Sequence, residues 1–100
     1  ATVAIASDCN PGSSYTTSMP FCIAAAVSLL GFTVEEAVLA ATFGGAQALR
    51  RDDIGQIAIG KRADTVLLES SSYIHLAYRP GVHLVHSTYK SGRAVTTWQK

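Results

Sequence analysis

The first half of the chain alternates short apolar runs with turn-forming polar residues. Its first run, Val3 to Ala6, is partly β-branched and leads to Asp8, which precedes a turn of Asn, Pro, Gly and Ser. This pattern predicts a strand that carries a carboxylate to the loop at its end. In parallel α/β proteins, loops at the carboxyl ends of strands build the active site. Asp8 is therefore the leading candidate for a functional residue, with the alternative that it only binds backbone amides of the turn.

A helix follows this loop. Residues 21–30 are apolar on almost every side, which is typical of a helix buried all round. Thr16 and Thr17 are candidates for the N-cap, Pro20 falls in the first turn, and Gly31 ends the helix. The predicted strand, loop and helix make one βα unit.

A second helix is predicted from residue 34 to about residue 49. Thr33 and Glu36 form a capping box at its start, so we assign the glutamate a structural role. Apolar residues recur at helical spacing along the segment. Gly44 and Gly45 interrupt the pattern at a cost of about 1 kcal/mol each relative to Ala. Two adjacent glycines predict close helix packing or a kink.

The second half of the chain has the pattern of a small β-rich unit. The expected elements are strands over 56–59 and 63–69, a helical turn over 73–78, and a hairpin of 82–89 with 94–98. We therefore divide the chain into two parts, 1–50 and 51–100.

Composition narrows the function classes. The chain has 100 residues and a net charge of +1, and its basic residues are scattered, so no nucleic-acid or membrane-surface partner is expected. The longest apolar run, Met19 to Leu30, is too short to cross a bilayer. The chain opens inside an apolar run without an initiator methionine, so we expect the natural protein to continue upstream.

The cysteines and histidines do not by themselves indicate a metal or disulfide site. Cys9 and Cys22 form no CxxC pair and no disulfide framework, which favours a cytoplasmic setting. The histidines lie at positions without zinc-ligand spacing, and two of them, His83 and His86, are expected on opposite faces of a strand. Surface or packing roles are predicted for them.

Several stretches resemble a known family. Residues 7–14, Ser-Asp-Cys-Asn-Pro-Gly-Ser-Ser, are similar to the last barrel strand and loop of the imidazolonepropionases, metal-dependent amidohydrolases of histidine degradation. Residues 33–49 resemble the paired helix after that barrel. Residues 55–66 resemble the pattern GxIxxGxxADxVxL of amidohydrolases in general, and residues 73–93 again resemble imidazolonepropionases. The resemblance spans essentially the whole chain.

The resemblance implies a fold of the α/β class. Residues 1–50 would contain the last βα unit of a TIM-like amidohydrolase barrel, with its active-site loop and two helices. Residues 51–100 would form the C-terminal part of a small β-sandwich domain.

The resemblance also implies a chemistry. Asp8 would be a metal ligand and the catalytic proton acceptor, and Asn10, Gly12 and Ser13 would line the substrate site. The implied cofactor is one Zn or Fe ion, and the implied substrate is 4-imidazolone-5-propanoate, hydrolysed to N-formimidoyl-L-glutamate. A homodimer is expected for the full-length enzyme.

This sequence departs from the family in one respect. The family's HxH pair and further metal-binding histidines are absent, and a catalytic zinc site takes about three protein ligands. We therefore expect the isolated 100 residues to be inactive. Two alternatives stay open: another amidohydrolase, such as a deaminase or a dihydroorotase-like enzyme, and a non-catalytic stand-alone module.

Overall fold

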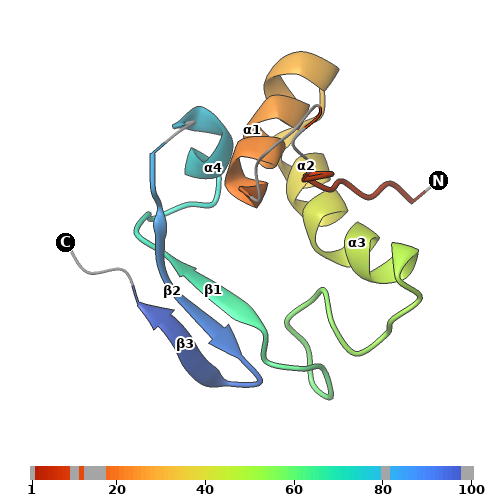
Figure 1. Cartoon of the computed structure of the whole chain (residues 1–100), viewed down its shortest axis with the longest axis vertical. Helices are drawn as coiled ribbons and strands as arrows, with labels where there is room; N and C mark the ends of the chain where they lie inside the picture. Colours follow the sequence, from red (N-terminus) through yellow and green to blue (C-terminus); the bar gives the residue numbers. More distant parts are fainter. Residues whose placement is uncertain (1, 10–11, 13–17, 80–81, 98–100) are drawn as a thin grey trace.

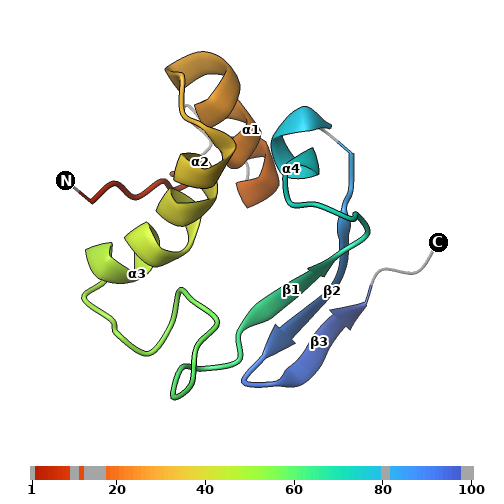
Figure 2. The same ribbon diagram turned by 180° about the vertical axis from the view of Figure 1, so that it is seen from behind.

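The computed structural model describes residues 2–9, 12, 18–79 and 82–97 of the chain. Along the chain its elements are α1 (Met19–Leu30), α2 (Val34–Ala41), α3 (Phe43–Ala48), β1 (Thr65–Leu68), α4 (His75–Tyr78), β2 (Val85–Lys90) and β3 (Arg93–Thr97). The helices α1, α2 and α4 gather at one end, and the sheet lies at the other (Figures 1 and 2). The predicted α/β class is confirmed at this level.

Helix α1 begins and ends where local signals predict. The side chain of Ser18 accepts a hydrogen bond from the amide of Phe21 at 3.3 Å, and Pro20 sits in the first turn. Gly31 ends the helix in the left-handed conformation, with φ of 75°. The cap is therefore Ser18, and the predicted candidates Thr16 and Thr17 lie outside the described residues.

The prediction that α1 is buried on all sides is wrong for this chain. Ile23 and Ala26 face the core, where they pack with Ala37 of α2. Leu29 and Leu30, in contrast, expose 80% and 69% of their surface. The reason is that α2 and α4 cover only part of the helix surface (Figure 1).

The capping box at the start of α2 is confirmed. The amide of Thr33 donates to Oε1 of Glu36 at 2.8 Å, and the amide of Glu36 donates to Oγ1 of Thr33 at 3.1 Å. The predicted single helix over 34–49 is broken, however, because Thr42 leaves the helical conformation with φ of −118° and ψ of −83°. Its hydroxyl donates to the carbonyl of Val38 at 2.8 Å, a bond that bends helices.

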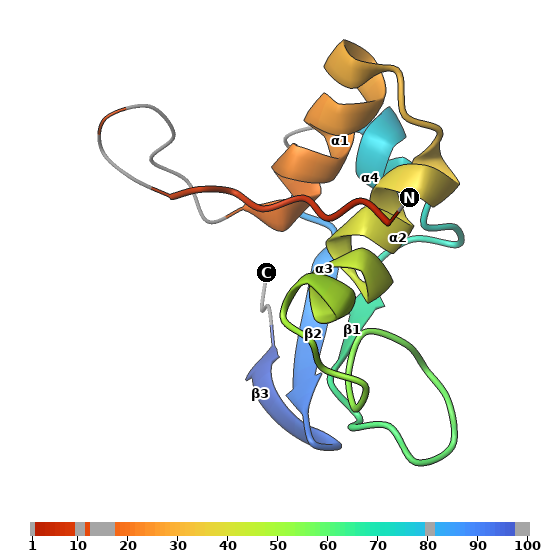
Figure 3. The same cartoon turned by 90° about the vertical axis from the view of Figure 1, so that its right-hand side faces the viewer.

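The segment containing Val3 to Ala6 is not a strand among the described residues. It runs past the start of α1 to α2 instead (Figure 3), and the carbonyl of Val3 lies against Gly44 of α3. The amide of Ile5 donates to the carbonyl of Ala40 at 3.2 Å, an acceptor in the last turn of α2 that has no partner within that helix. A strand needs a neighbouring strand, and in the described part of the chain none lies beside this segment.

The three strands form one antiparallel sheet in the order β1-β2-β3. Thr65 of β1 pairs with Tyr89 of β2, and Lys90 pairs with Arg93 across the hairpin turn. Ser91 and Gly92 form that turn with φ of 52° and 78°, as expected for a tight hairpin. The predicted hairpin is confirmed, although Trp98 lies outside the described residues.

Two other predictions for the second half have different outcomes. The predicted strand over 56–59 is wrong, because these residues form a loop. The predicted strand over 63–69 is present as the shorter β1, and the predicted turn over 73–78 is present as α4. Leu76 of α4 packs against the core formed by α1 and α2, so the second half contributes to the helical layer.

Candidate functional site

Asp8 lies at the end of the extended N-terminal segment, and its surface is exposed. Its backbone has φ of 50°, in the left-handed region that aspartate tolerates better than most residues. Such a residue turns the chain sharply, as the predicted turn after the apolar run requires. The chain then continues to Ser18 at the start of α1.

The other predicted site residues come between Asp8 and α1 in the sequence. Gly12 is in a turn and exposed. Asn10 and Ser13 lie outside the described residues. The grouping of these residues into a substrate site therefore stays a prediction.

The described part of the chain does not form a metal site by itself. Within residues 2–9, 12, 18–79 and 82–97, no three His, Cys, Asp or Glu side chains are grouped so that they could hold an ion. A carboxylate such as that of Asp8 is a suitable oxygen ligand, but one ligand does not complete a catalytic centre. We derive no reaction step through a metal from these residues alone.

The histidines make local contacts. The ring of His75 stands edge-on to Tyr78, with 6.0 Å between ring centroids. Nδ1 of His86 lies 3.2 Å from Oγ of Ser87. His75 Nδ1 is buried without a hydrogen-bond partner among the described residues. These contacts agree with the packing roles expected for the imidazole rings.

A hollow of about 280 Å³ lies between the start of α1 and the segment that leads into β2. Arg79 and His83 line it together with Ser18, and Phe21 and Leu76 contribute apolar walls. Ser18, one of its lining residues, is the N-cap of α1. In the sequence, Ser18 follows the stretch that begins at Asp8.

A second hollow, of about 430 Å³, lies between α3 and the loop that follows it. Phe43 and Ile54 are among its apolar lining residues, and Arg50, Arg51 and Lys61 are its basic ones.

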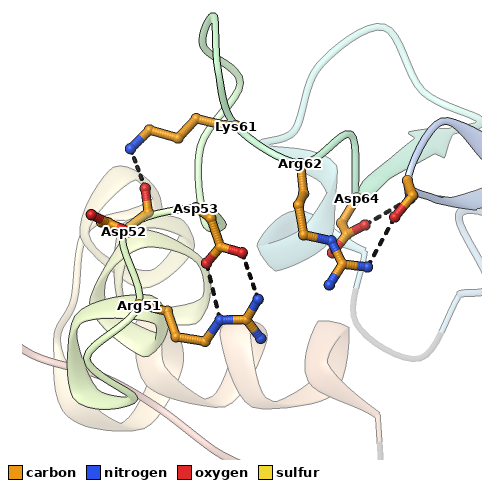
Figure 4. Close-up of polar contacts among 7 residues, drawn as sticks. Arg51, Asp52, Asp53, Lys61, Arg62 and Asp64 are labelled. Atoms are coloured by element: carbon orange, nitrogen blue, oxygen red, sulfur yellow. Dashed lines mark hydrogen bonds and ion pairs between the residues drawn. The ribbon is translucent and has the colours of Figure 1, made fainter.

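Around this second hollow runs a polar network that the sequence patterns did not reveal (Figure 4). Arg51 holds the carboxylate of Asp53 in two hydrogen bonds, from Nε at 3.0 Å and from Nη2 at 2.6 Å. The hydrogen bond from Arg51 lowers the pKa of Asp53 below its usual range. Lys61 Nζ donates to the carbonyl of Asp52. In the sequence, this network is indicated only by the acidic and basic residues that lie on either side of a glycine turn.

The same network joins the loop to the sheet. Arg62 lies 3.5 Å from the carboxylate of Asp64 and donates to Oγ of Ser91 at 3.0 Å. The amide of Ser91 donates to Asp64 at 2.8 Å. These contacts connect the start of β1 to the hairpin turn, so we assign them a role in holding the sheet together.

No helix in the described ranges has both the length and the apolar character needed to span a membrane.

Comparison with known proteins shows which family and which relatives this chain is similar to. The family model described as "Amidohydrolase family" matches residues 1–95. The imidazolonepropionase of Mycolicibacterium smegmatis is 61% identical over 98 residues, which is 98% of this chain and 24% of that relative. The imidazolonepropionase of Streptomyces griseus is 61% identical over 95 residues, 95% of this chain and 24% of the relative.

A solved structure agrees with the sequence comparisons. The structure of E. coli guanine deaminase superposes with a TM-score of 0.70 at 27% sequence identity, covering 91% of this chain and 27% of that protein. This chain thus spans about a quarter of the length of the relatives that it matches. Since the family model covers residues 1–95, the chain belongs to the amidohydrolase family.

Proposed function

We propose that this chain forms part of an imidazolonepropionase, which hydrolyses 4-imidazolone-5-propanoate to N-formimidoyl-L-glutamate. The observation that carries the proposal is the 61% identity to an imidazolonepropionase across 98% of this chain. The identity to guanine deaminase is much lower, at 27%. Both candidate functions are hydrolases that cleave a C–N bond of a cyclic substrate.

In this proposal Asp8 supplies one carboxylate to a metal centre whose other ligands come from the rest of a longer polypeptide. Zn and Fe are both compatible with such an oxygen ligand. When bound, an ion of this kind would lower the pKa of its water to about 7. The Asp8 carboxylate would accept a proton during hydrolysis, since a carboxylate beside the reacting water is a suitable general base. Its exposed position on a sharply turned backbone supports this role.

The loop after Asp8 would contact the substrate. Asn10 and Ser13 offer side-chain hydrogen bonds, and Gly12 allows the backbone to approach closely. Such groups suit the polar imidazolone ring and the carboxylate of its propanoate arm.

In the fold proposed for the whole enzyme, the extended N-terminal segment would have neighbouring strands to pair with. In a TIM-like barrel residues 3–6 would be the last strand and would pair with neighbouring strands, while residues 51–100 would belong to a small β-sandwich. The similarity to guanine deaminase supports this architecture. For the full-length enzyme we propose a cytoplasmic homodimer that acts on a small molecule, without a nucleic-acid or membrane partner.

A deaminase is the second candidate. The observation in its favour is the TM-score of 0.70 to guanine deaminase. A stand-alone, non-catalytic module is not favoured, because the family match covers residues 1–95 and includes the Asp8 segment.

The role of Asp8 can be tested in a chimera in which this chain replaces the matching 98 residues of the M. smegmatis relative. We expect the chimera to hydrolyse 4-imidazolone-5-propanoate and Asp8→Asn to reduce kcat by a factor of at least about 100, since general-base catalysis alone contributes that much. Glu36→Gln is the control, because it keeps the capping hydrogen bond. Near-normal turnover by the Asp8→Asn chimera would make Asp8 only a turn residue.

A further inference from the structure

The N-terminal segment meets the junction of α2 and α3 at two backbone points (Figure 3). The amide of Ile5 donates to the carbonyl of Ala40 at 3.2 Å. The carbonyl of Val3 lies against Gly44, where a Cβ would overlap the carbonyl oxygen and lie 3.0 Å from the carbonyl carbon. The side chain of Ile5 also packs against the core of α1 and α2. The segment that leads to Asp8 is therefore held on the helices in one register.

The break between α2 and α3 provides the acceptor for this contact. In an unbroken helix the amide of Thr42 would bond to the carbonyl of Val38. Here the hydroxyl of Thr42 donates to that carbonyl at 2.8 Å, and the amide donates to Leu39 at 3.2 Å. In an unbroken helix the carbonyl of Ala40 would accept the amide of Gly44. Here it accepts the amide of the N-terminal segment, so the break and the contact belong together.

Gly44 is the small residue that this close approach requires. It is buried, and the atoms that a Cβ would meet belong to the backbone of Val3 and Leu39. Backbone atoms cannot rotate away as the end of a flexible side chain can, so a larger residue must displace the N-terminal segment. At Gly45 a Cβ would make only an ordinary contact, 3.9 Å from the carbonyl oxygen of Ala40. The requirement therefore applies to the first glycine of the pair.

These contacts lie close to Asp8 along the chain. Ile5 precedes Asp8 by three residues, about 10 Å of extended backbone. Successive residues of an extended segment direct their backbone groups to opposite edges, so Ala4 and Ala6 leave the other edge for a neighbouring strand. The helices hold one edge, and the segment turns sharply at Asp8, where φ is 50°. A shift of the segment along the helices would therefore move the Asp8 carboxylate.

We infer that Thr42 and Gly44 are positioning residues for the Asp8 carboxylate. The Thr42 hydroxyl keeps the carbonyl of Ala40 available to the amide of Ile5, and Gly44 lets the segment come close enough to reach it. Both act through the backbone of residues 3–5. The inference rests on the proposed function, in which Asp8 is a metal ligand. Loss of a residue that orients a metal ligand typically lowers metal affinity by a factor of about 10–100.

The test uses the chimera with the M. smegmatis relative, prepared without metal and titrated with Zn²⁺ in competition with a chelator. Gly44→Ala should weaken zinc binding by a factor of about 10–100. Gly45→Ala is the matched control, since it adds the same methyl group without the overlap, and should leave zinc binding unchanged. Hydrogen exchange at the Ile5 amide of the metal-free chimera should become faster in the Gly44→Ala variant alone.

A second control separates positioning from a general loss of stability. Glu36→Ala removes the acceptor of the Thr33 amide at the start of α2, the opposite end of the helix from Ala40. It should lower the melting temperature of the metal-free chimera and leave zinc affinity unchanged. If Glu36→Ala weakened zinc binding as much as Gly44→Ala at a similar loss of melting temperature, the effect would be one of stability and the inference would be overturned.

Two variants of Thr42 test the same role without added volume, and they decide the matter if Gly44→Ala does not fold. Thr42→Val removes the hydroxyl and favours the unbroken helix, so zinc binding should weaken. Thr42→Ser keeps the hydroxyl and should retain the zinc affinity of the unsubstituted chimera. Equal zinc affinity of the valine and serine variants would overturn the role of the hydroxyl and, with it, the inference.

Zinc affinity and turnover together distinguish this inference from the proposed function. Zinc binding that depends on Gly44, in a chimera without imidazolonepropanoate turnover, would support the positioning role and count against the proposed reaction. Turnover by a chimera in which Gly44→Ala and Gly45→Ala bind zinc equally well would support the reaction and overturn the positioning role. A chimera that binds no zinc would overturn both the positioning role and the assignment of Asp8 as a metal ligand.

Discussion

At Gly44 the N-terminal segment lies close against the helices. A Cβ at this position would overlap the carbonyl oxygen of Val3. At Gly45 the same atom would only reach ordinary van der Waals contact, 3.9 Å from the carbonyl oxygen of Ala40. The two adjacent glycines therefore have different roles, and only the first allows the segment that carries Asp8 to cross the helices.

This difference gives a matched pair of variants. Gly44→Ala should destabilise the chain by roughly 1–3 kcal/mol through overpacking. Gly45→Ala should be neutral or stabilising by up to about 1 kcal/mol, because alanine is the better helix former. Urea unfolding followed by circular dichroism measures both, and hydrogen exchange at the Ile5 amide reports on the crossing segment. Equal stability of the two variants would contradict the assigned role of Gly44.

The Arg51–Asp53 pair predicts a pH dependence at the residue scale. The hydrogen bond from Arg51 comes first among the causes that lower the pKa of Asp53. A carboxyl with a lowered folded-state pKa stabilises the fold above its unfolded pKa of about 3.9, and loses that contribution as the pH falls through the folded value.

Arg51→Gln should therefore raise the pKa of Asp53 toward its ordinary value. An NMR titration of the Asp53 carboxyl measures the change directly. The Arg50→Gln variant is the control, since Arg50 is not a partner in the Asp53 pair. An Asp53 titration that is the same in the Arg51→Gln variant and the unsubstituted chain would show that the pair does not form in solution.

At the scale of elements, the capping box of α2 is the clearest case of a structure set by local sequence. Glu36→Ala removes the acceptor for the Thr33 amide and should cost about 0.5–2 kcal/mol of stability, the range found for lost helix caps. Glu36→Gln keeps an oxygen at the same place and should cost much less. Thermal unfolding of the two variants tests this order, and equal losses would show that charge at the helix end, not the hydrogen bond, stabilises α2.

The elements that sequence patterns predicted correctly are those determined by nearby residues. The Thr33–Glu36 box, the left-handed Gly31 and the Ser91–Gly92 turn each act within a few residues. The break at Thr42 is also local, but it depends on whether a threonine hydroxyl donates to the backbone of its own helix, which the residue pattern does not determine.

The two strand predictions that proved wrong depend on distant partners. Residues 3–6 and 56–59 have the alternation or β-branching of strands, yet a strand exists only where a second strand supplies its hydrogen bonds. In the described part of the chain the first segment bonds to the end of α2, and the second forms a closed loop. The position of Asp8 at the start of a turn could be predicted from the turn residues that follow it. Its surroundings could not be predicted, because they require residues far away in sequence.

At the scale of the whole molecule, the chain has a radius of gyration of 13.7 Å, somewhat above the value near 13 Å typical of a folded domain of this length. Its core is small, and its large apolar side chains lie on several faces. The chain matches about a quarter of an imidazolonepropionase. This match and the properties above support the proposal that the chain is one part of a larger amidohydrolase.

The most direct test of this account is the turnover of two substrates by the chimera in which this chain replaces the matching part of the M. smegmatis relative. The account predicts hydrolysis of 4-imidazolone-5-propanoate and no measurable release of ammonia from guanine. Deamination of guanine without imidazolonepropanoate hydrolysis would contradict it and would assign the chain to a deaminase.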